Sequence, residues 1–228
     1  MQNELCLCED GSHTLFSERV GECYHSTHGA YTESMHIFIN LGFKAVVERE
    51  MVTKFKLVRI LEVGFGTGLN ALLTALESEE KKISVSYLGL EPFPVLPVTL
   101  QQLNYCKILS GNSEQFFTAM HASEWNTTHQ LNPYFNFKKQ LTGFMEAKLQ
   151  KDGFDLIYFD AFSPDAQPEL WEPEVFEKCF DILAKDGILV TYCAKGVVKR
   201  ALKSAGLTIE NLPGPPGKRE ITRARKLI

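Results

Sequence analysis

The chain of 228 residues is predicted to fold as a doubly wound α/β domain with a small N-terminal extension. From about Leu57 onward, strand-like apolar segments alternate with helical segments, which is typical of a parallel sheet with helical connections. Segments such as LIYF and ILVTY are apolar on both faces, which indicates strands covered by helices on both sides of the sheet. A glycine-rich turn joins the first of these strands directly to a helix, as in nucleotide-type binding folds.

The individual elements follow from local patterns. Residues 4–17 alternate around Asp10-Gly11 and predict a β-hairpin. Apolar residues at helical spacing from Thr32 to Glu48 predict a helix. We therefore expect an extension over residues 1–55 and the α/β domain over residues 56–228. In the α/β domain we expect strands at 59–65, 83–91, 154–161 and 187–193, helices at 69–78, 94–105, 173–183 and 196–205, and a C-terminal antiparallel hairpin formed by 207–211 and 219–224. The segment 107–150 has no clear pattern, and we leave it unassigned.

Composition limits the class of protein. Hydrophobic residues make up 44% of the chain and charged residues 23%, as in ordinary soluble domains. The apolar runs are too short to span a bilayer, and no signal peptide follows Met1, so we expect a cytoplasmic protein without a membrane partner. The six cysteines lack the paired spacing of a zinc site, so we expect free thiols and no metal.

Charge is unevenly distributed along the chain. The segment from Lys195 to Ile228 carries nine Lys and Arg against two Glu. Its net charge is therefore +7, and that of the first 194 residues is −11. A basic segment of this kind is compatible with a surface that contacts phosphates. An ordinary solvated surface is the competing interpretation.

The glycine turn ILEVGFGTGLN, Ile60 to Asn70, is the most specific local signal. Glycines at 64, 66 and 68 allow a tight turn and let backbone amides approach a ligand at the helix N-terminus. The G-x-G-x-x-G fingerprint of dinucleotide-binding folds fails here, because Leu69 stands where the third glycine belongs. The E-x-G-x-G-x-G form, which starts at Glu62, resembles instead the first motif of class I S-adenosylmethionine-dependent methyltransferases. Glu91 ends the next strand, where an acid can accept both ribose hydroxyls in either class of protein.

Longer motifs narrow the resemblance to one family. The segments GECYHSTHGAYTESMHIFI, EVGFGTGLNALL, LEPFP, YFDAFSPDAQPELWEPEVF and GKREITRAR occur in the order found in bacterial MnmC-type proteins. The chain therefore resembles the methyltransferase part of these tRNA 5-methylaminomethyl-2-thiouridine biosynthesis enzymes. It has no room for the FAD-dependent oxidase domain of the two-domain members, so we expect the stand-alone methyltransferase form.

The resemblance implies a reaction and a set of site residues. It implies transfer of a methyl group from S-adenosylmethionine to the amine of 5-aminomethyl-2-thiouridine at the tRNA wobble position, with contacts to the anticodon region. The implied cofactor-binding residues are Glu62, Gly64, Phe65, Gly66, Thr67, Gly68, Asn70 and Glu91. The implied catalytic residues are Asp160 and Phe162, and those for substrate binding are Tyr24, Ser26, Glu33, Lys199, Arg200, Lys218 and Arg219. The residue that contacts adenine stays unassigned, because FNFKKQLTGF offers only Gln140 and Thr142.

Asp160 follows a buried strand and precedes a loop stiffened by Pro164 and Pro168. An unperturbed Asp is a weak base for an alkylamine, so we expect Asp160 to recruit and orient the amine rather than to deprotonate it strongly. A plain helix cap or solvated strand end is the competing interpretation. Phe162 is expected to stack on the uracil or to pack beside the methyl group, and Trp171 to anchor the helix near Pro173.

Three other functions stay open at this stage. The chain could methylate another small or RNA-borne amine, act as an NAD-dependent oxidoreductase, or bind tRNA without catalysis. The presence of Glu62, the three turn glycines, Glu91 and Asp160 argues against the last.

Overall fold

A computed structural model describes residues 3–48 and 57–227. Within these residues the main sheet has eight strands. They are β4 (Leu57–Val63), β5 (Ser84–Leu90), β6 (Thr128–Asn132), β7 (Phe135–Gln140), β8 (Phe154–Phe159), β9 (Leu183–Thr191), β10 (Thr208–Pro213) and β11 (Glu220–Arg225). Their order across the sheet is β10-β11-β9-β8-β4-β5-β7-β6. The five central strands are parallel, and antiparallel strands close both edges.

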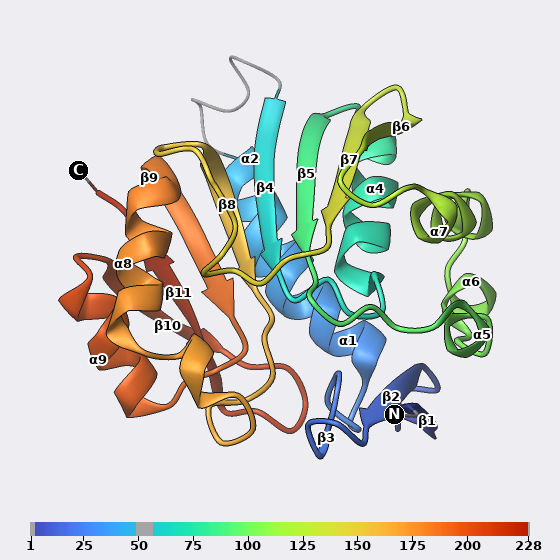
Figure 1. Cartoon of the computed structure of the whole chain (residues 1–228), viewed down its shortest axis with the longest axis horizontal. Helices are drawn as coiled ribbons and strands as arrows, with labels where there is room; N and C mark the ends of the chain where they lie inside the picture. The colour runs from blue at the N-terminus through green and yellow to red at the C-terminus, as the bar shows by residue number, and fades with distance from the viewer. Residues whose placement is uncertain (1–2, 49–56, 228) are drawn as a thin grey trace.

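The N-terminal part forms a second, three-stranded sheet and a long helical segment. The strands are β1 (Asn3–Leu7), β2 (His13–Ser17) and β3 (Glu22–Cys23), and the predicted hairpin around Asp10-Gly11 is present. The helical segment consists of α1 (Ala30–Ser34), η1 (Met35–Lys44) and α2 (Ala45–Val47), and its middle part has π-helical pairing. The small sheet lies below the carboxyl ends of the parallel strands in Figure 1. It therefore borders the edge at which ligands bind in this kind of sheet.

Helices connect the strands of the main sheet. They are α4 (Leu69–Lys81), α5 (Pro97–Leu100), α6 (Tyr105–Ile108), α7 (Ser113–Ala122), η2 (Pro168–Leu170), α8 (Pro173–Ile182) and α9 (Gly196–Ser204). The predicted helix at 94–105 is shorter than expected. It breaks after α5 because the side chain of Asn104 turns to the N-terminal hairpin, where it accepts from the backbone N–H of His13 and donates to the carbonyl of Gly11. The unassigned segment 107–150 contains α7, β6 and β7.

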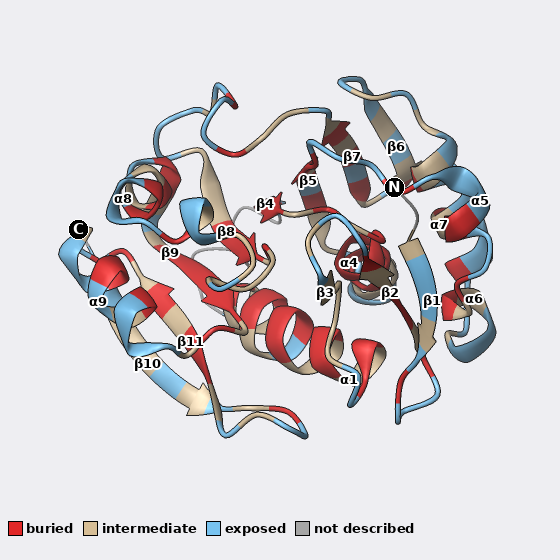
Figure 2. Cartoon of the chain, turned by 60° about the horizontal axis from the view of Figure 1, so that its bottom comes forward, coloured by how far each residue is buried: buried red, intermediate tan, exposed pale blue. Residues whose placement is uncertain are grey.

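The sheet separates two hydrophobic clusters, as the doubly wound prediction requires. Alternation along β4 sends Ile60 to one side and Leu61 to the other, and Tyr158 and Phe159 divide in the same way on β8. The first cluster includes the apolar face of η1 together with α4, and the second includes α8 and α9. Figure 2 shows the buried residues concentrated where these helices meet the strands. The helix of the N-terminal extension therefore shares a core with the sheet.

Two predictions stay open at the level of the fold. The boundary predicted between residues 55 and 56 lies outside the described residues. None of the helices in the described part of the chain is long and apolar enough to cross a bilayer. The cytoplasmic location stays a prediction.

Candidate active site

The glycine turn after β4 is held against the neighbouring strand. The backbone N–H groups of Gly64 and Phe65 donate to the carbonyl of Leu90 at 3.2 and 3.0 Å. Gly64 has a φ of 89°, and a Cβ atom there would lie 2.5 Å from the carbonyl oxygen of Asp160. A side chain at this position would therefore push the backbone of β4 and the backbone after β8 apart.

Glu91 is fixed directly behind this turn. Its Oε2 accepts from the N–H of Gly66 and its Oε1 from the N–H of Phe93, both at 2.9 Å. Burial raises the pKa of Glu91, and the two backbone donors lower it. The carboxylate thus has a fixed orientation, and each oxygen keeps a further lone pair for a ligand hydroxyl.

A cavity of about 480 Å³ opens at the carboxyl ends of the strands. This is within the size range of cofactor and small-ligand sites. Its lining comes from the glycine turn, Glu91, the loop after β7 and the loop after β8, together with Arg19, Tyr24 and His25 of the N-terminal part. The fit to an adenosyl cofactor follows from three features: a backbone cradle at the glycines, an oriented carboxylate at Glu91 and a cavity of sufficient volume.

Asp160 lies directly beyond β8, at the floor of the cavity. Its backbone N–H donates to the carbonyl of Val63, which ties the end of β8 to the end of β4. The pKa of Asp160 is raised to about 7, mainly by burial and also by the charge of Glu33, while Asn70 and Lys218 act in the opposite direction. The sequence-based expectation assumed an ordinary aspartate, so this carboxylate is a stronger base than we expected.

Asn70 joins two carboxyl groups at the start of α4. Its Nδ2 donates to Oδ2 of Asp160 at 2.8 Å and to Oε1 of Glu62 at 3.0 Å. Glu62 is only 1% exposed and lies behind the cavity wall, and burial raises its pKa well above the ordinary value. Within the described residues, Oδ1 of Asn70 has no hydrogen-bond partner. Because Asn70 lines the cavity, a donor on a bound ligand can satisfy this buried oxygen.

Aromatic side chains form the opposite wall. The rings of Tyr24 and Phe162 meet edge to face, with their centroids 5.0 Å apart. Trp171 donates from Nε1 to the carbonyl of Phe162 and packs on Phe159 and Phe176. Trp171 is therefore the expected anchor below α8, and it also fixes the backbone of the Phe162 loop.

The other N-terminal candidates, Ser26 and Glu33, lie beside the cavity and do not line it. The backbone N–H of Ser26 donates to Oε2 of Glu33, and Oε1 of Glu33 pairs with Lys218 at 2.7 Å. The ring of His25 contacts Oγ1 of Thr14, and burial lowers the pKa of His25 to about 4. His28 is exposed and pairs with Glu9. His25 is thus neutral near pH 7, and it lines the cavity.

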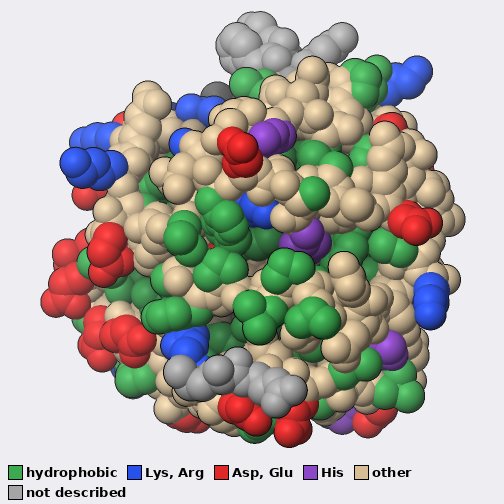
Figure 3. Space-filling model, turned by 45° about the vertical axis from the view of Figure 1, so that its right-hand side comes forward, with side chains coloured by type: hydrophobic (Ala, Val, Ile, Leu, Met, Phe, Trp, Pro, Cys, Tyr) green, Lys and Arg blue, Asp and Glu red, His purple; other side chains and the backbone are tan. Residues whose placement is uncertain are grey.

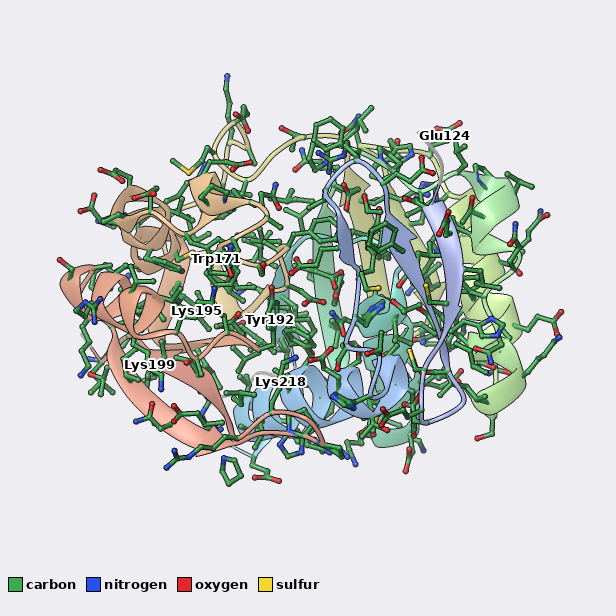
Figure 4. All side chains as sticks on the ribbon, turned by 90° about the horizontal axis from the view of Figure 1, so that it is seen from below. Glu124, Trp171, Tyr192, Lys195, Lys199 and Lys218 are labelled. Atoms are coloured by element: carbon green, nitrogen blue, oxygen red, sulfur yellow. The ribbon has the colours of Figure 1, made fainter. Side chains whose placement is uncertain are left out.

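The basic C-terminal segment is largely neutralised by nearby acids. Lys199 pairs with Glu220 at 2.9 Å, and Lys218 pairs with Glu33. Arg200 and Arg219 are exposed, and neither forms an ion pair with the described part of the chain. Figure 4 places Lys218 near Tyr192 and the N-terminal helix, whereas Lys199 lies farther out. The excess of positive charge in the sequence therefore overstates the free positive charge on this surface.

The sequence did not identify part of the cavity lining. The loop after β7 contributes Thr142, Gly143, Phe144, Met145 and Glu146 to the lining. Of these, only Thr142 was considered for adenine, and the carboxylate of Glu146 lies directly over Gly143. The alternating pattern of FNFKKQ is the signal that could have placed a strand, and hence this loop, at the site.

The mouth of the cavity has an apolar rim. Phe93 is 52% exposed, and the guanidinium of Arg19 lies 3.9 Å from its ring centroid. Met145, from the loop after β7, is also exposed. Figure 3 shows hydrophobic side chains gathered over the middle of the side that it presents. No group of His, Cys, Asp or Glu side chains in the described ranges is arranged to hold a metal ion.

Comparisons with known proteins identify the class of protein that this chain resembles. A family model described as S-adenosyl-L-methionine-dependent methyltransferase matches residues 119–227. The tRNA 5-methylaminomethyl-2-thiouridine biosynthesis bifunctional protein MnmC of Cupriavidus metallidurans is 31% identical over 97% of this chain and 34% of its own length. The protein of the same name from Azoarcus sp. is 28% identical over 98% of this chain and 35% of its own length. The chain thus spans about a third of the length of these curated relatives.

Solved structures show the same fold. The crystal structure of MNMC2 from Aquifex aeolicus matches with a TM-score of 0.74 and 27% identity, over 99% of this chain and 70% of that chain. Spermidine synthase from Thermotoga maritima matches with a TM-score of 0.51 at 12% identity, over 99% of this chain and 72% of that chain, which shows the fold alone. The predicted class I methyltransferase fold and the resemblance to MnmC are confirmed.

Proposed function

We propose that this chain, a methyltransferase that uses S-adenosylmethionine, methylates the aminomethyl group of 5-aminomethyl-2-thiouridine at the tRNA wobble position. The observation that carries the proposal is the carboxylate of Asp160, which faces the cofactor-sized cavity beside Phe162 and Tyr24. The similarity to MnmC proteins over nearly the whole chain supports the choice of substrate. When bound, S-adenosylmethionine supplies an electrophilic methyl group on a sulfonium centre.

The residues that would hold the cofactor are those of the glycine turn and Glu91. Backbone N–H groups at the start of α4 suit the carboxylate of its methionine part, and Oδ1 of Asn70 suits an ammonium donor. Glu91 suits the two ribose hydroxyls. Thr142 and Glu146 are our candidates for the adenine end, because both lie on the remaining wall of the cavity.

Asp160 is proposed to act on the acceptor amine. An alkylammonium is the dominant form in water near pH 7, and it has no free lone pair for attack. A buried carboxylate attracts this cation, and a raised pKa lets the same carboxylate take up a proton from it. Asn70 donates to Oδ2 of Asp160. We therefore assign the contact with the amine to Oδ1, to which no other group in the described part of the chain donates.

Aromatic residues and exposed arginines are proposed to position the tRNA. Phe162 and Tyr24 provide an apolar wall for the uracil ring next to the amine. Arg200 and Arg219 are the preferred phosphate contacts, because the ammonium groups of Lys199 and Lys218 are already engaged by carboxylates.

The test is transfer of a labelled methyl group to two tRNAs that differ only in the wobble uridine. One carries 5-aminomethyl-2-thiouridine, and the matched control carries 2-thiouridine. We expect label on the first alone, recovered as 5-methylaminomethyl-2-thiouridine after digestion to nucleosides. Equal label on both tRNAs, or methylation of a small amine with neither tRNA labelled, contradicts the proposal.

A further inference from the structure

An ion pair next to Asp160 joins two distant parts of the chain. Lys218, in the loop between β10 and β11, lies 2.7 Å from Oε1 of Glu33 in α1. The Lys218 ammonium also lies 5.3 Å from the ring centroid of Tyr192, just after β9. The hydroxyl of Tyr192 donates at 2.9 Å to the carbonyl of Ala161, the residue that follows Asp160. Figure 4 shows Lys218 near Tyr192 and beside the N-terminal helix. The same loop is held a second time, because Nε2 of His36 donates to the carbonyl of Pro213 at 2.8 Å.

This pair adds two opposite charges to the surroundings of Asp160. Burial is the main cause of the raised pKa of Asp160, Glu33 raises it further, and Lys218 lowers it. Five other polar groups interact with Asp160 through charge or a hydrogen bond. They are Glu62 of β4, Asn70 of α4, Tyr87 of β5, Tyr105 of α6 and Tyr192. Burial raises the pKa of Glu62 and of all three tyrosines, and Asn70 carries no charge. Beyond burial, Glu33 and Lys218 are therefore the two charged groups with opposite effects on Asp160.

Glu33 by itself would compete with Asp160. Two neighbouring carboxylates do not both stay ionised easily, and the charge of an unpaired Glu33 would favour protonation of Asp160. Glu33 is 7% exposed, so its charge needs a partner. Lys218 provides that partner, and the N–H of Ser26 occupies the second oxygen of Glu33.

We propose that Lys218 is a positioning residue of the acceptor site: by neutralising Glu33, it leaves Asp160 free to hold the acceptor's ammonium without the influence of a second, unpaired carboxylate charge nearby. The proposal rests on the proposed function for the statement that the acceptor is an amine. It gives Lys218 a role different from the phosphate contact expected from the sequence. If Lys218 contacted a tRNA phosphate instead, Glu33 would be left buried and without an ion-pair partner.

The test measures the titration of Asp160 without any acceptor. The whole protein, labelled with ¹³C at the aspartate carboxyl carbons, is titrated by NMR, and Asp160→Asn identifies the signal. Lys218→Met should raise the pKa of Asp160 by about one unit, because it exposes Asp160 to the unpaired charge of Glu33. Glu33→Gln should lower that pKa, and the double variant should lie between the two single variants.

Two further variants control for folding and for the loss of an ion pair as such. Lys218→Arg keeps the charge and should stay close to the wild-type titration. Arg225→Met removes a cation that pairs with Glu210 in the same hairpin, at the opposite end of β11, and should leave the signal of Asp160 unchanged. If Lys218→Met does not fold, Glu33→Gln alone must still lower the pKa of Asp160.

Shifts of opposite sign for the two partners support the proposal. If the ion pair only holds the fold together, neither Lys218→Met nor Glu33→Gln should shift the pKa of Asp160. This result would overturn the proposal. Because no acceptor is present, the outcome does not depend on whether the wobble uridine is the substrate. A separate assay with the aminomethyl tRNA should show the acid limb of the kcat/KM profile moving in the same directions, with cofactor affinity unchanged.

Discussion

The side-chain amide of Asn70 donates to Oδ2 of Asp160 across 2.8 Å. The same nitrogen donates to Oε1 of Glu62, so the first residues of α4 fix the acid at the end of β4 and the acid beyond β8 together. The segment that contains the glycine turn thus also orients the carboxylate that we assign to the acceptor. The proposed cofactor site and the proposed acceptor site are therefore joined by hydrogen bonds.

Replacing Asn70 should disturb the acceptor carboxylate. The hydrogen bond from Asn70 lowers the pKa of Asp160, so Asn70→Ala should raise that pKa and move the acid limb of kcat/KM to higher pH. Transfer at pH 7 should fall about tenfold, which is a typical cost of removing a hydrogen bond to a charged group. A pH series checks this, with Asn136→Ala on the exposed side of β7 as the control. An acid limb that stays in place rules out this role for Asn70.

Gly64 can be tested against a glycine of similar conformation. Both Gly64 (φ 89°) and Gly11 (φ 80°) have left-handed backbones, but a Cβ at Gly11 has open space, whereas one at Gly64 lies 2.5 Å from the Asp160 carbonyl. Each alanine variant should lose about 1–2 kcal/mol from the strained backbone. Gly64→Ala should lose clearly more in thermal denaturation, and it should also lose methyl transfer. Equal losses of stability would show that the close approach to Asp160 does not matter.

Glu91 should control cofactor affinity. Glu91→Gln keeps the size of the side chain but removes its charge and one of its two acceptor oxygens. Calorimetry with S-adenosylmethionine should show binding weakened by a factor on the order of ten or more, as expected for the loss of hydrogen bonds to a charged group. Glu177→Gln, on the exposed side of α8, serves as the control. Unchanged affinity in Glu91→Gln would remove this residue from the cofactor site.

Asp160 should reduce the stability of the protein at high pH. Its pKa in the folded protein is about 7, above its ordinary value of 3.8, so the folded state holds this proton more tightly than the unfolded state. The resulting contribution to stability is present at low pH and is lost as pH rises from about 4 to about 7. Asp160→Asn removes this loss. The Tm of the variant minus that of the wild type should therefore be larger at pH 8 than at pH 5, and a difference independent of pH contradicts the raised pKa.

The parallel strands and the glycine turn could be predicted because their signals are local. The largely apolar strand β8 and the sequence from Glu62 to Asn70 specify a buried strand and a strand–turn–helix unit without help from distant residues. Asp160 was identified for the same reason, since it directly follows such a strand. The segment 107–150 was not assigned, because β6 and β7 are short and partly polar strands, whose stability depends on pairing: β7 pairs with β5, and the edge strand β6 pairs with β7.

Properties of the site that depend on long-range contacts could not be predicted from the sequence. The pair of Glu33 and Lys218 joins residues 185 positions apart, and no local pattern identifies such partners. The raised pKa of Asp160 follows from burial and from Glu33, both of which exist only in the folded chain. The same holds for the phosphate contacts, because several cations of the basic segment are neutralised by acids distant in sequence.

Methyl transfer by Asp160→Asn tests the central claim most directly. Both the variant and the wild type are given labelled S-adenosylmethionine and tRNA that carries 5-aminomethyl-2-thiouridine, and cofactor affinity is measured in parallel by calorimetry. We expect transfer to fall by at least ~100-fold, because both the capture of the ammonium and the uptake of its proton are lost, while cofactor affinity stays within several-fold. Retained transfer, or joint loss of transfer and cofactor binding, would contradict the assignment of Asp160 to the acceptor amine.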